Sequence, residues 1–190
     1  MRPRPSAALS SHPALNTPGA AARHYLGDLV YGANDGLITT FAVVAGVAGA
    51  SLHPSIVLIL GLANLFADGF SMGASNFLSL RSRAAVERGE KLPVTEPFPV
   101  RHALATFLAF VLAGVIPLVA YVVAGDTRPF LVATLVTLAV LFAVGASRSL
   151  VTGGRWWVDG LEMFAVGSAA AGVAFMVGRL LATVAAQVLP

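Results

Sequence analysis

The stretch YGANDGLITTFAVVAGVAGA, residues 31–50, decides the class of fold that this sequence adopts. Asp35 is its only charged side chain, and with Leu29 and Val30 it forms an apolar run that is long enough to cross a bilayer core, which takes about 20 helical residues. Four comparable runs follow, at residues 55–80, 103–125, 129–147 and 160–184. We therefore predict five membrane spans, the first at residues 29–50.

The composition of the whole chain indicates the same class. The 190 residues are 57% hydrophobic and 11% charged, with a mean hydropathy of +0.81, whereas soluble domains carry about 25% charged residues. The spans are predicted to be helices because an open sheet would leave backbone groups unpaired in lipid, and the runs lack the alternation of a β-barrel. The predicted fold is an all-α integral membrane protein with the lipid bilayer as its main surroundings.

The first 22 residues differ from the rest of the chain. They are rich in Pro, Ala and Ser and contain no short apolar core with a cleavage site, so we predict a disordered tail and no cleaved signal peptide. Residues 23–190 then form one five-span domain. The chain has no cysteine, which excludes disulfides, thiolate metal sites and cysteine nucleophiles.

Basic residues predict the topology. Ten of the twelve lie before the first span, between the second and third spans, or between the fourth and fifth spans. Only Arg128 and Arg179 lie on the other side of the membrane. The positive-inside rule then puts the N-terminus in the cytoplasm and the C-terminus outside the cell or in an organelle lumen. The sequence pI near 10 is interpreted as this topological signal, so no nucleic-acid partner is expected.

Ionisable residues inside a span are candidates for function, since each costs about 2.5–3.5 kcal/mol to insert. Asp35 lies about two turns into the first span. Asp28 precedes it by seven residues, which returns a helical side chain to within about 20° of the same face. The two carboxylates are therefore expected on one face, with Asp28 near the cytoplasmic end and Asp35 deeper.

The second span has the pattern of a helix with one polar and one apolar face. The polar stripe comprises Asn64, Asp68, Ser71, Met72 and Ser75, and the apolar face comprises Leu62, Phe66, Phe70 and Phe77. Carboxylates, an amide, hydroxyls and a thioether together suit a divalent transition metal, and the thioether favours iron or manganese over calcium or magnesium.

Structural alternatives remain for each of these residues. Asp35 could be a buried carboxylate hydrogen-bonded to Thr39 or Thr40. Asp68 could cap a kink or pair with an arginine, while Asn64 could join helices and Met72 could serve only packing.

Polar residues near the span ends have alternatives as well. Glu162, near the start of the fifth span, could form a salt bridge with Arg155 or Arg148 or take part in transport. His53 and His102, at predicted span ends, are interpreted as solvated histidines.

Pairs of small residues recur in the spans. Gly32 with Gly36, Gly46 with Ala50, and Gly167 with Ala171 are each four residues apart. This spacing lets helix backbones approach closely, but it is too common to establish a dimer by itself.

Two long motifs closely resemble those of the vacuolar iron transporter family. They are residues 31–50 and GLANLFADGFSMGASNFLSLRSR, residues 61–83; IPL at 116–118 and RWWVDGLEMFAVG at 155–167 also match. The resemblance covers about residues 23–185. It implies five spans, a homodimer, and a metal path between the subunits for ferrous iron or manganese, exported from the cytosol in exchange for protons. It also implies metal-site roles for Asp35, Met72 and, at the entrance, Asp28.

The chain departs from the family pattern at two points. Plant iron-transporting members have a glutamate where this chain has Asn64, and Asp68 one turn away is a candidate to supply that charge. Those members also carry a long, Glu-rich metal-binding domain between spans 2 and 3, where this chain has only about twenty residues. The choice between iron and manganese therefore stays open.

The functional hypothesis is a metal transporter without a resident cofactor, in which Fe²⁺ or Mn²⁺ is the substrate. A passive cation channel and a structural membrane protein are the alternatives. An enzyme ranks last because no Ser/His pair or HExxH motif lies within the spans. A short chain without the metal-binding domain suggests a bacterial plasma membrane, with a vacuolar membrane expected if the source is eukaryotic.

Overall fold

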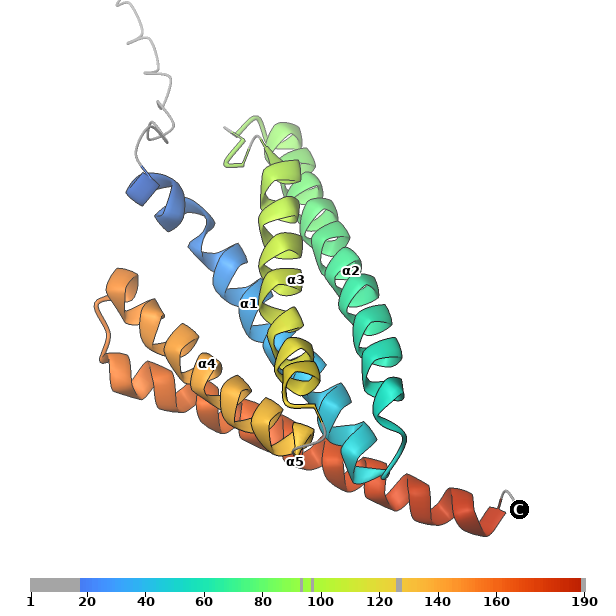
Figure 1. The fold of residues 1–190 in the computed structure, drawn as a ribbon. Coiled ribbons are helices and arrows are strands. Elements are labelled where there is room, and N and C mark those ends of the chain that lie inside the picture. The colour runs from blue at the N-terminus through green and yellow to red at the C-terminus, as the bar shows by residue number, and fades with distance from the viewer. Residues whose placement is uncertain (1–17, 93, 97, 126–127, 189–190) are drawn as a thin grey trace, which may run out of the picture.

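The computed structural model describes residues 18–92, 94–96, 98–125 and 128–188. The described residues form five helices and no strand (Figure 1). The helices are α1 (Pro18–Gly49), α2 (Pro54–Gly89), α3 (Pro99–Val123), α4 (Pro129–Thr152) and α5 (Trp156–Val188). The predicted all-α fold with five spans is confirmed. Most of the predicted tail, residues 1–17, lies outside the described residues, and the helix begins at Pro18.

The helix ends follow local sequence signals. Pro54, Pro99 and Pro129 stand in the first turns of α2, α3 and α4, where the missing N–H costs no helical hydrogen bond. Gly153 ends α4 in the left-handed conformation at φ 71°, which suits glycine. Helix α2 continues nine residues beyond the predicted span end at Leu80, so its last two turns and more extend past the apolar run.

All five helices are long and apolar enough to cross a membrane. Their outward surfaces carry large apolar side chains such as Leu112, Val123 and Leu180, each more than half exposed. Contiguous apolar surface of this kind is compatible with lipid and not with water. The chain is an integral membrane protein.

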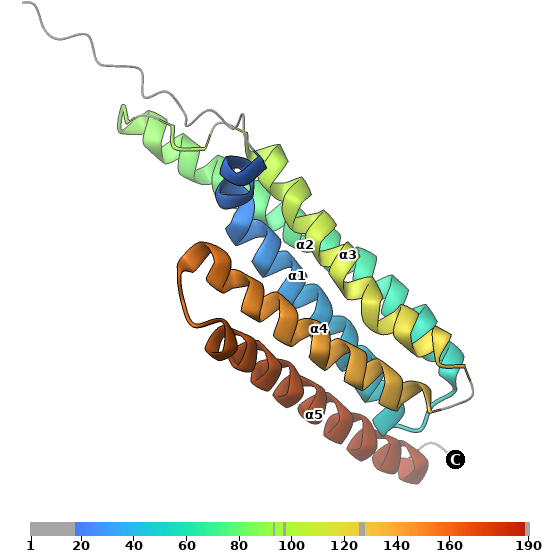
Figure 2. The same cartoon turned by 60° about the vertical axis from the view of Figure 1, so that its left-hand side comes forward.

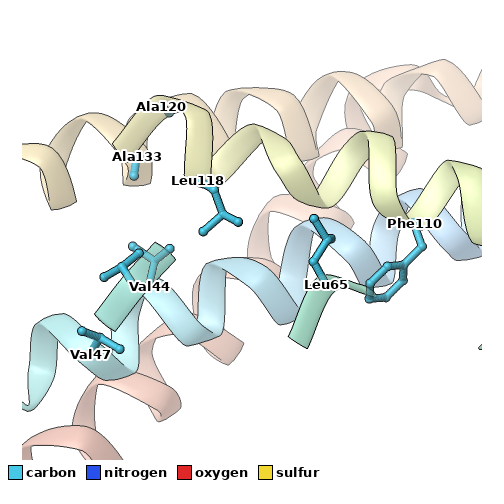
Figure 3. Close-up of a cluster of buried hydrophobic side chains, with 8 residues drawn as sticks. Val44, Val47, Leu65, Phe110, Leu118, Ala120 and Ala133 are labelled. Carbon is cyan, nitrogen blue, oxygen red and sulfur yellow. The ribbon is translucent and has the colours of Figure 1, made fainter. Parts of the chain in front are cut away.

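Helix α1 is the centre of the bundle. It lies between the α2–α3 pair and the α4–α5 pair (Figure 2) and contacts all four other helices. Figure 3 shows a core cluster to which α1 contributes Val44 and Val47, with Leu65 from α2, Phe110 and Leu118 from α3, and Ala133 from α4. The cluster ties both helix pairs to α1.

Glycines let α1 approach α3 closely. A Cβ atom added to Gly32 would lie 2.5 Å from the carbonyl oxygen of Thr106, and one added to Gly36 would overlap the carbonyl oxygen of Phe110. Gly49 and Gly178 form similar close contacts between α1 and α5. These small residues therefore serve packing within one chain, which accounts for the small-residue pair in the first span without a second subunit.

Candidate metal site

A polar groove of about 470 Å³ lies between α1 and α2. It is lined by Gly27, Asp28 and Tyr31 of α1 and by Ser71, Met72, Ser75, Asn76 and Ser79 of α2. Three members of the stripe predicted from the sequence, Ser71, Met72 and Ser75, therefore face one groove together with the Asp28 carboxylate.

The position of the stripe follows from how α2 packs. Gly61, Leu65, Gly69 and Gly73 are buried, and Gly69 and Gly73 lie against α3 side chains and backbone. Leu62, Phe66 and Phe70 are exposed to between 44% and 72% and form the outer apolar face. Since these two faces are taken by α3 and by the surroundings, the polar stripe is left facing α1 and the groove.

Asp35 of α1 and Asp68 of α2 belong to neighbouring helices and do not line the groove. Both side chains are partly buried, and α1 and α2 contact each other. The Asn64 side-chain amide donates a 2.7 Å hydrogen bond to Oδ2 of Asp68. A partly buried carboxylate at membrane depth is stabilised by a nearby cation.

The hydrogen-bonding alternative for Asp35 finds no support among the described residues. The Thr39 hydroxyl donates to the backbone carbonyl of Asp35 at 2.8 Å, and not to the carboxylate. The hydroxyl of Thr40 is buried without a hydrogen-bond partner there. The Asp35 carboxylate thus receives neither of the two bonds that a purely structural role would use.

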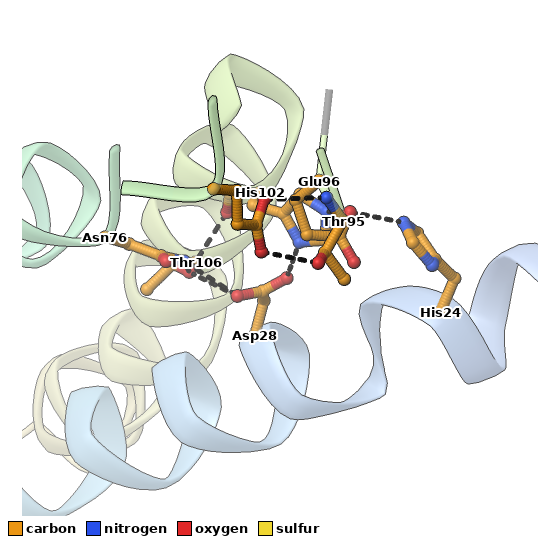
Figure 4. A network of polar contacts seen from close by, with 8 residues as sticks. His24, Asp28, Asn76, Thr95, Glu96, His102 and Thr106 are labelled. Carbon is orange, nitrogen blue, oxygen red and sulfur yellow. Dashed lines mark hydrogen bonds and ion pairs between the residues drawn. The ribbon is translucent and has the colours of Figure 1, made fainter. Parts of the chain in front are cut away.

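Asp28 is held at the end of the groove by residues of α2 and α3 (Figure 4). Its Oδ1 accepts a 2.7 Å hydrogen bond from the Asn76 amide, and its Oδ2 lies 2.6 Å from Nδ1 of His102. Thr106 approaches Oδ1 at 3.4 Å. Asp28 therefore joins three helices and has a fixed orientation.

His102 corrects one expectation from the sequence. It is not solvated: it is 6% exposed, and its ring bridges Asp28 and Glu96. No local sequence pattern predicts this pairing, because Asp28 lies 74 positions before His102. The two residues meet only through the close contact between α1 and α3. His53, by contrast, is exposed, and its Nδ1 accepts the backbone N–H of Ser55 at the start of α2.

Glu162 lies apart from the groove. It is on α5, which does not contact α2, and its carboxylate is 3.7 Å from Arg148, with 61% of the side chain exposed. This geometry agrees with the salt-bridge alternative.

Comparison with known sequences gives one consistent family. A sequence model described as the VIT family matches residues 26–93 and 89–179. The two segments overlap at residues 89–93, where α2 ends and the α2–α3 connection begins. Together they include residues of all five helices.

Curated relatives match over most of the chain. A vacuolar iron transporter of Toxoplasma gondii is 26% identical, covering 83% of this chain and 74% of the relative. Vacuolar iron transporter 1 of Oryza sativa subsp. japonica is 24% identical, covering 82% and 85%. Vacuolar iron transporter homolog 4 of Arabidopsis thaliana is 33% identical over 59% of this chain and 62% of its own length.

Proposed function

Because the chain belongs to the VIT family, we propose that it transports divalent iron or manganese across a membrane, out of the cytosol and in exchange for protons. The observation that carries the proposal is the polar α1–α2 groove lined by Asp28 and Met72; Asp35 and Asp68 lie on the same two helices. The relatives are named as transporters, which supports a role other than catalysis.

The proposed ligands have different roles. Asp35 and Met72 bind the ion within the membrane, and Asp68, oriented by Asn64, adds a second carboxylate. Asp28 receives the ion at the groove end. Carboxylate oxygens with one thioether suit borderline ions such as Fe²⁺ and Mn²⁺.

Proton exchange follows from competition at the same oxygens. The ionised Asp35 carboxylate binds either the metal or a proton, and the protonated, neutral form does not hold the metal. Loss of the metal leaves the Asp35 carboxylate without a cation, and a proton then takes the place of the metal. The carboxylate therefore alternates between holding the metal ion and holding a proton during transport.

A homodimer is proposed because one chain leaves polar groups on its outer surface. Tyr31, Ser71, Ser75 and Ser79 line the groove and are exposed in the single chain. Hydroxyls at membrane depth need a polar neighbour or water. A second copy packed over the groove supplies polar neighbours, and it doubles the number of metal ligands.

The expected membrane and orientation rest on the sequence. The distribution of basic residues supports a cytoplasmic N-terminus and a C-terminus outside the cell or in a lumen. The chain is proposed to act in a bacterial plasma membrane as an efflux protein. In a eukaryotic cell the vacuolar membrane is the counterpart, as the names of the curated relatives suggest.

The test is uptake of Fe²⁺ and Mn²⁺ into proteoliposomes that contain a pH-sensitive dye. The proposal expects metal uptake with matching proton exit for the natural chain, loss of both in Asp35→Asn, and normal transport in Glu90→Gln, which removes an exposed charge outside the groove. Metal uptake without proton movement would indicate a channel. Absence of metal uptake by the natural chain would contradict the proposal.

A further inference from the structure

We propose that His24, Glu96 and His102 form a second metal-binding site, at the end of the bundle where α1 begins. The three side chains come from α1, the α2–α3 connection and the first turns of α3 (Figure 4). One ligand atom from each lies within 4.8 Å of the others. Two imidazoles and one carboxylate are a donor set that binds divalent ions such as Fe²⁺ while leaving coordination positions open.

The distances suit a shared ion. Oε2 of Glu96 lies 3.0 Å from Nε2 of His102 and 3.4 Å from Nε2 of His24. Two ligand atoms that are each about 2.1 Å from a metal are about 3.0–3.4 Å apart at octahedral or tetrahedral angles. The His–Glu pairs therefore already have the spacing of ligands around one ion.

Asp28 fixes which nitrogen of His102 faces the site. A carboxylate can only accept, so Nδ1, 2.6 Å from Asp28, carries the hydrogen. Metal-binding histidines commonly donate their other ring N–H to a carboxylate in this way. Nε2 then points at Glu96, and these two acceptor atoms need a hydrogen or a metal ion between them.

The surroundings hold the three ligands while leaving one side open. Glu87 of α2, beyond the predicted end of the span, accepts the Thr95 hydroxyl at 2.5 Å and the Thr95 backbone N–H at 2.8 Å, and these bonds hold the pKa of the Glu87 carboxyl below its ordinary value. They also fix the residue next to Glu96. The His102 side chain is 8% exposed, whereas His24 and Glu96 are 26% and 23% exposed, so an ion can arrive from the solvent side.

The site is connected to the groove through Asp28, which contacts His102 and also lines the groove. We infer that the site is the first docking point for the transported ion. This role rests on the proposed transport, but metal binding at the three residues does not.

The probe is Mn²⁺ bound to the purified full-length chain. Electron paramagnetic resonance titration gives the Kd, and electron spin-echo modulation detects ¹⁴N couplings from imidazole ligands. We expect nitrogen couplings in the natural chain. His24→Ala and Glu96→Gln should each raise the Kd of this site about tenfold or more, and His24→Ala should also weaken the couplings. His53→Ala and Glu90→Gln remove an exposed histidine and an exposed glutamate elsewhere and should change neither quantity.

Asp28→Asn tests the positioning role. The amide oxygen can still accept from Nδ1 but without its charge, so the Kd should rise about 10–100-fold while the nitrogen couplings persist at saturation. His102→Ala is less informative alone, since the ring is buried and hydrogen-bonded. His24→Ala changes a more exposed side chain, so it tests metal binding without disturbing the fold.

Two results would overturn the site: bound Mn²⁺ without nitrogen couplings, or couplings and Kd unchanged in both His24→Ala and Glu96→Gln. The site and the transport proposal fail separately. Nitrogen couplings in a chain that moves no metal into proteoliposomes would retain the site and reject transport. Asp35→Asn should retain the couplings, because Asp35 is not among the three ligands.

Discussion

Helix α1 meets its two neighbours α3 and α2 in opposite ways. Toward α3 it presents Gly32 and Gly36, and the two backbones approach so closely that a single added carbon would collide with a carbonyl oxygen. Toward α2 it presents Asp28 and Tyr31, and the contact opens into a polar groove. One helix therefore combines a tightly packed face with a face that lines a groove.

The glycine contact with α3 and the groove with α2 have different functions. Close packing through glycines is how membrane helices associate without a hydrophobic driving force between them. This contact sets the position of α1 against α3, and Asp28 is held in place from both α2 and α3. Substitutions in the groove should therefore change metal handling, and substitutions at the Gly32–Gly36 contact should change stability.

Asp35→Asn is expected to have the largest effect. Replacing a residue that only hydrogen-bonds to a metal ligand lowers metal affinity about 10–100-fold. Removing the charge of the ligand itself should therefore lower the transport rate about 100-fold or more. The melting temperature should stay close to that of the natural chain, because the amide keeps the shape of the side chain. Transport and thermal denaturation measured on the same preparation check both parts, and a mutant that unfolds early would place Asp35 among the structural residues.

Gly36→Ala tests the packed side. The new methyl group would overlap the Phe110 carbonyl, and overpacking of this kind costs about 1–3 kcal/mol. Gly46→Ala is the matched control, since the nearest atom to its new Cβ is the Ala174 carbonyl oxygen at an ordinary 3.6 Å, and we expect a change within about 0.5 kcal/mol. Unfolding in detergent measures both. Equal effects of the two substitutions would contradict the account of the α1–α3 contact.

Met72→Leu separates chemistry from packing in the groove. Met72 packs against the core cluster and also lines the groove. Leucine keeps the volume, so stability should change by less than about 1.5 kcal/mol. Loss of the soft thioether should nevertheless lower the preference for Fe²⁺ or Mn²⁺ over Mg²⁺ by about tenfold. Changes around metal sites commonly alter metal affinity by this amount. Competition between Mg²⁺ and Mn²⁺ during uptake measures this, and an unchanged preference would reduce Met72 to packing.

Glu162→Gln should have the smallest effect. Its ion pair with Arg148 is mostly exposed, and such pairs contribute about 0–1 kcal/mol. A direct role of Glu162 in metal transport stays a prediction that the same variant tests. We expect a transport rate within about twofold of the natural chain, because α5 does not contact α2. A larger loss would require a metal site on α5.

The sequence predicted much of this fold because its signals are local. Apolar length located the five spans, and the period of an α-helix put Ser71, Met72 and Ser75 on one polar stripe, which the groove confirms. The helix ends were predicted less accurately: α2 runs to Gly89, beyond the predicted span end at Leu80. The thickness of a bilayer sets the length of a span but does not limit a helix that continues outside the membrane.

The cluster around His102 was not predictable in the same way. Its partners Asp28 and Glu96 lie on different segments, and they meet because Gly32 and Gly36 bring α3 against α1. A sequence shows that close approach is allowed there, but not which helix uses it. The solvated interpretation of His102 was wrong for that reason.

The most direct test of the central claim compares two faces of α2 by single-cysteine labelling. The natural chain has no cysteine, so Ser75→Cys, in the groove, and Leu62→Cys, on the outer apolar face, each provide a single reactive thiol. In membranes, we predict that a charged thiosulfonate modifies the cysteine at 75 but not the one at 62, and that Mn²⁺ slows the reaction at 75. Equal reactivity at both positions, or reaction at 75 that Mn²⁺ leaves unchanged, would contradict the groove as the path of the ion.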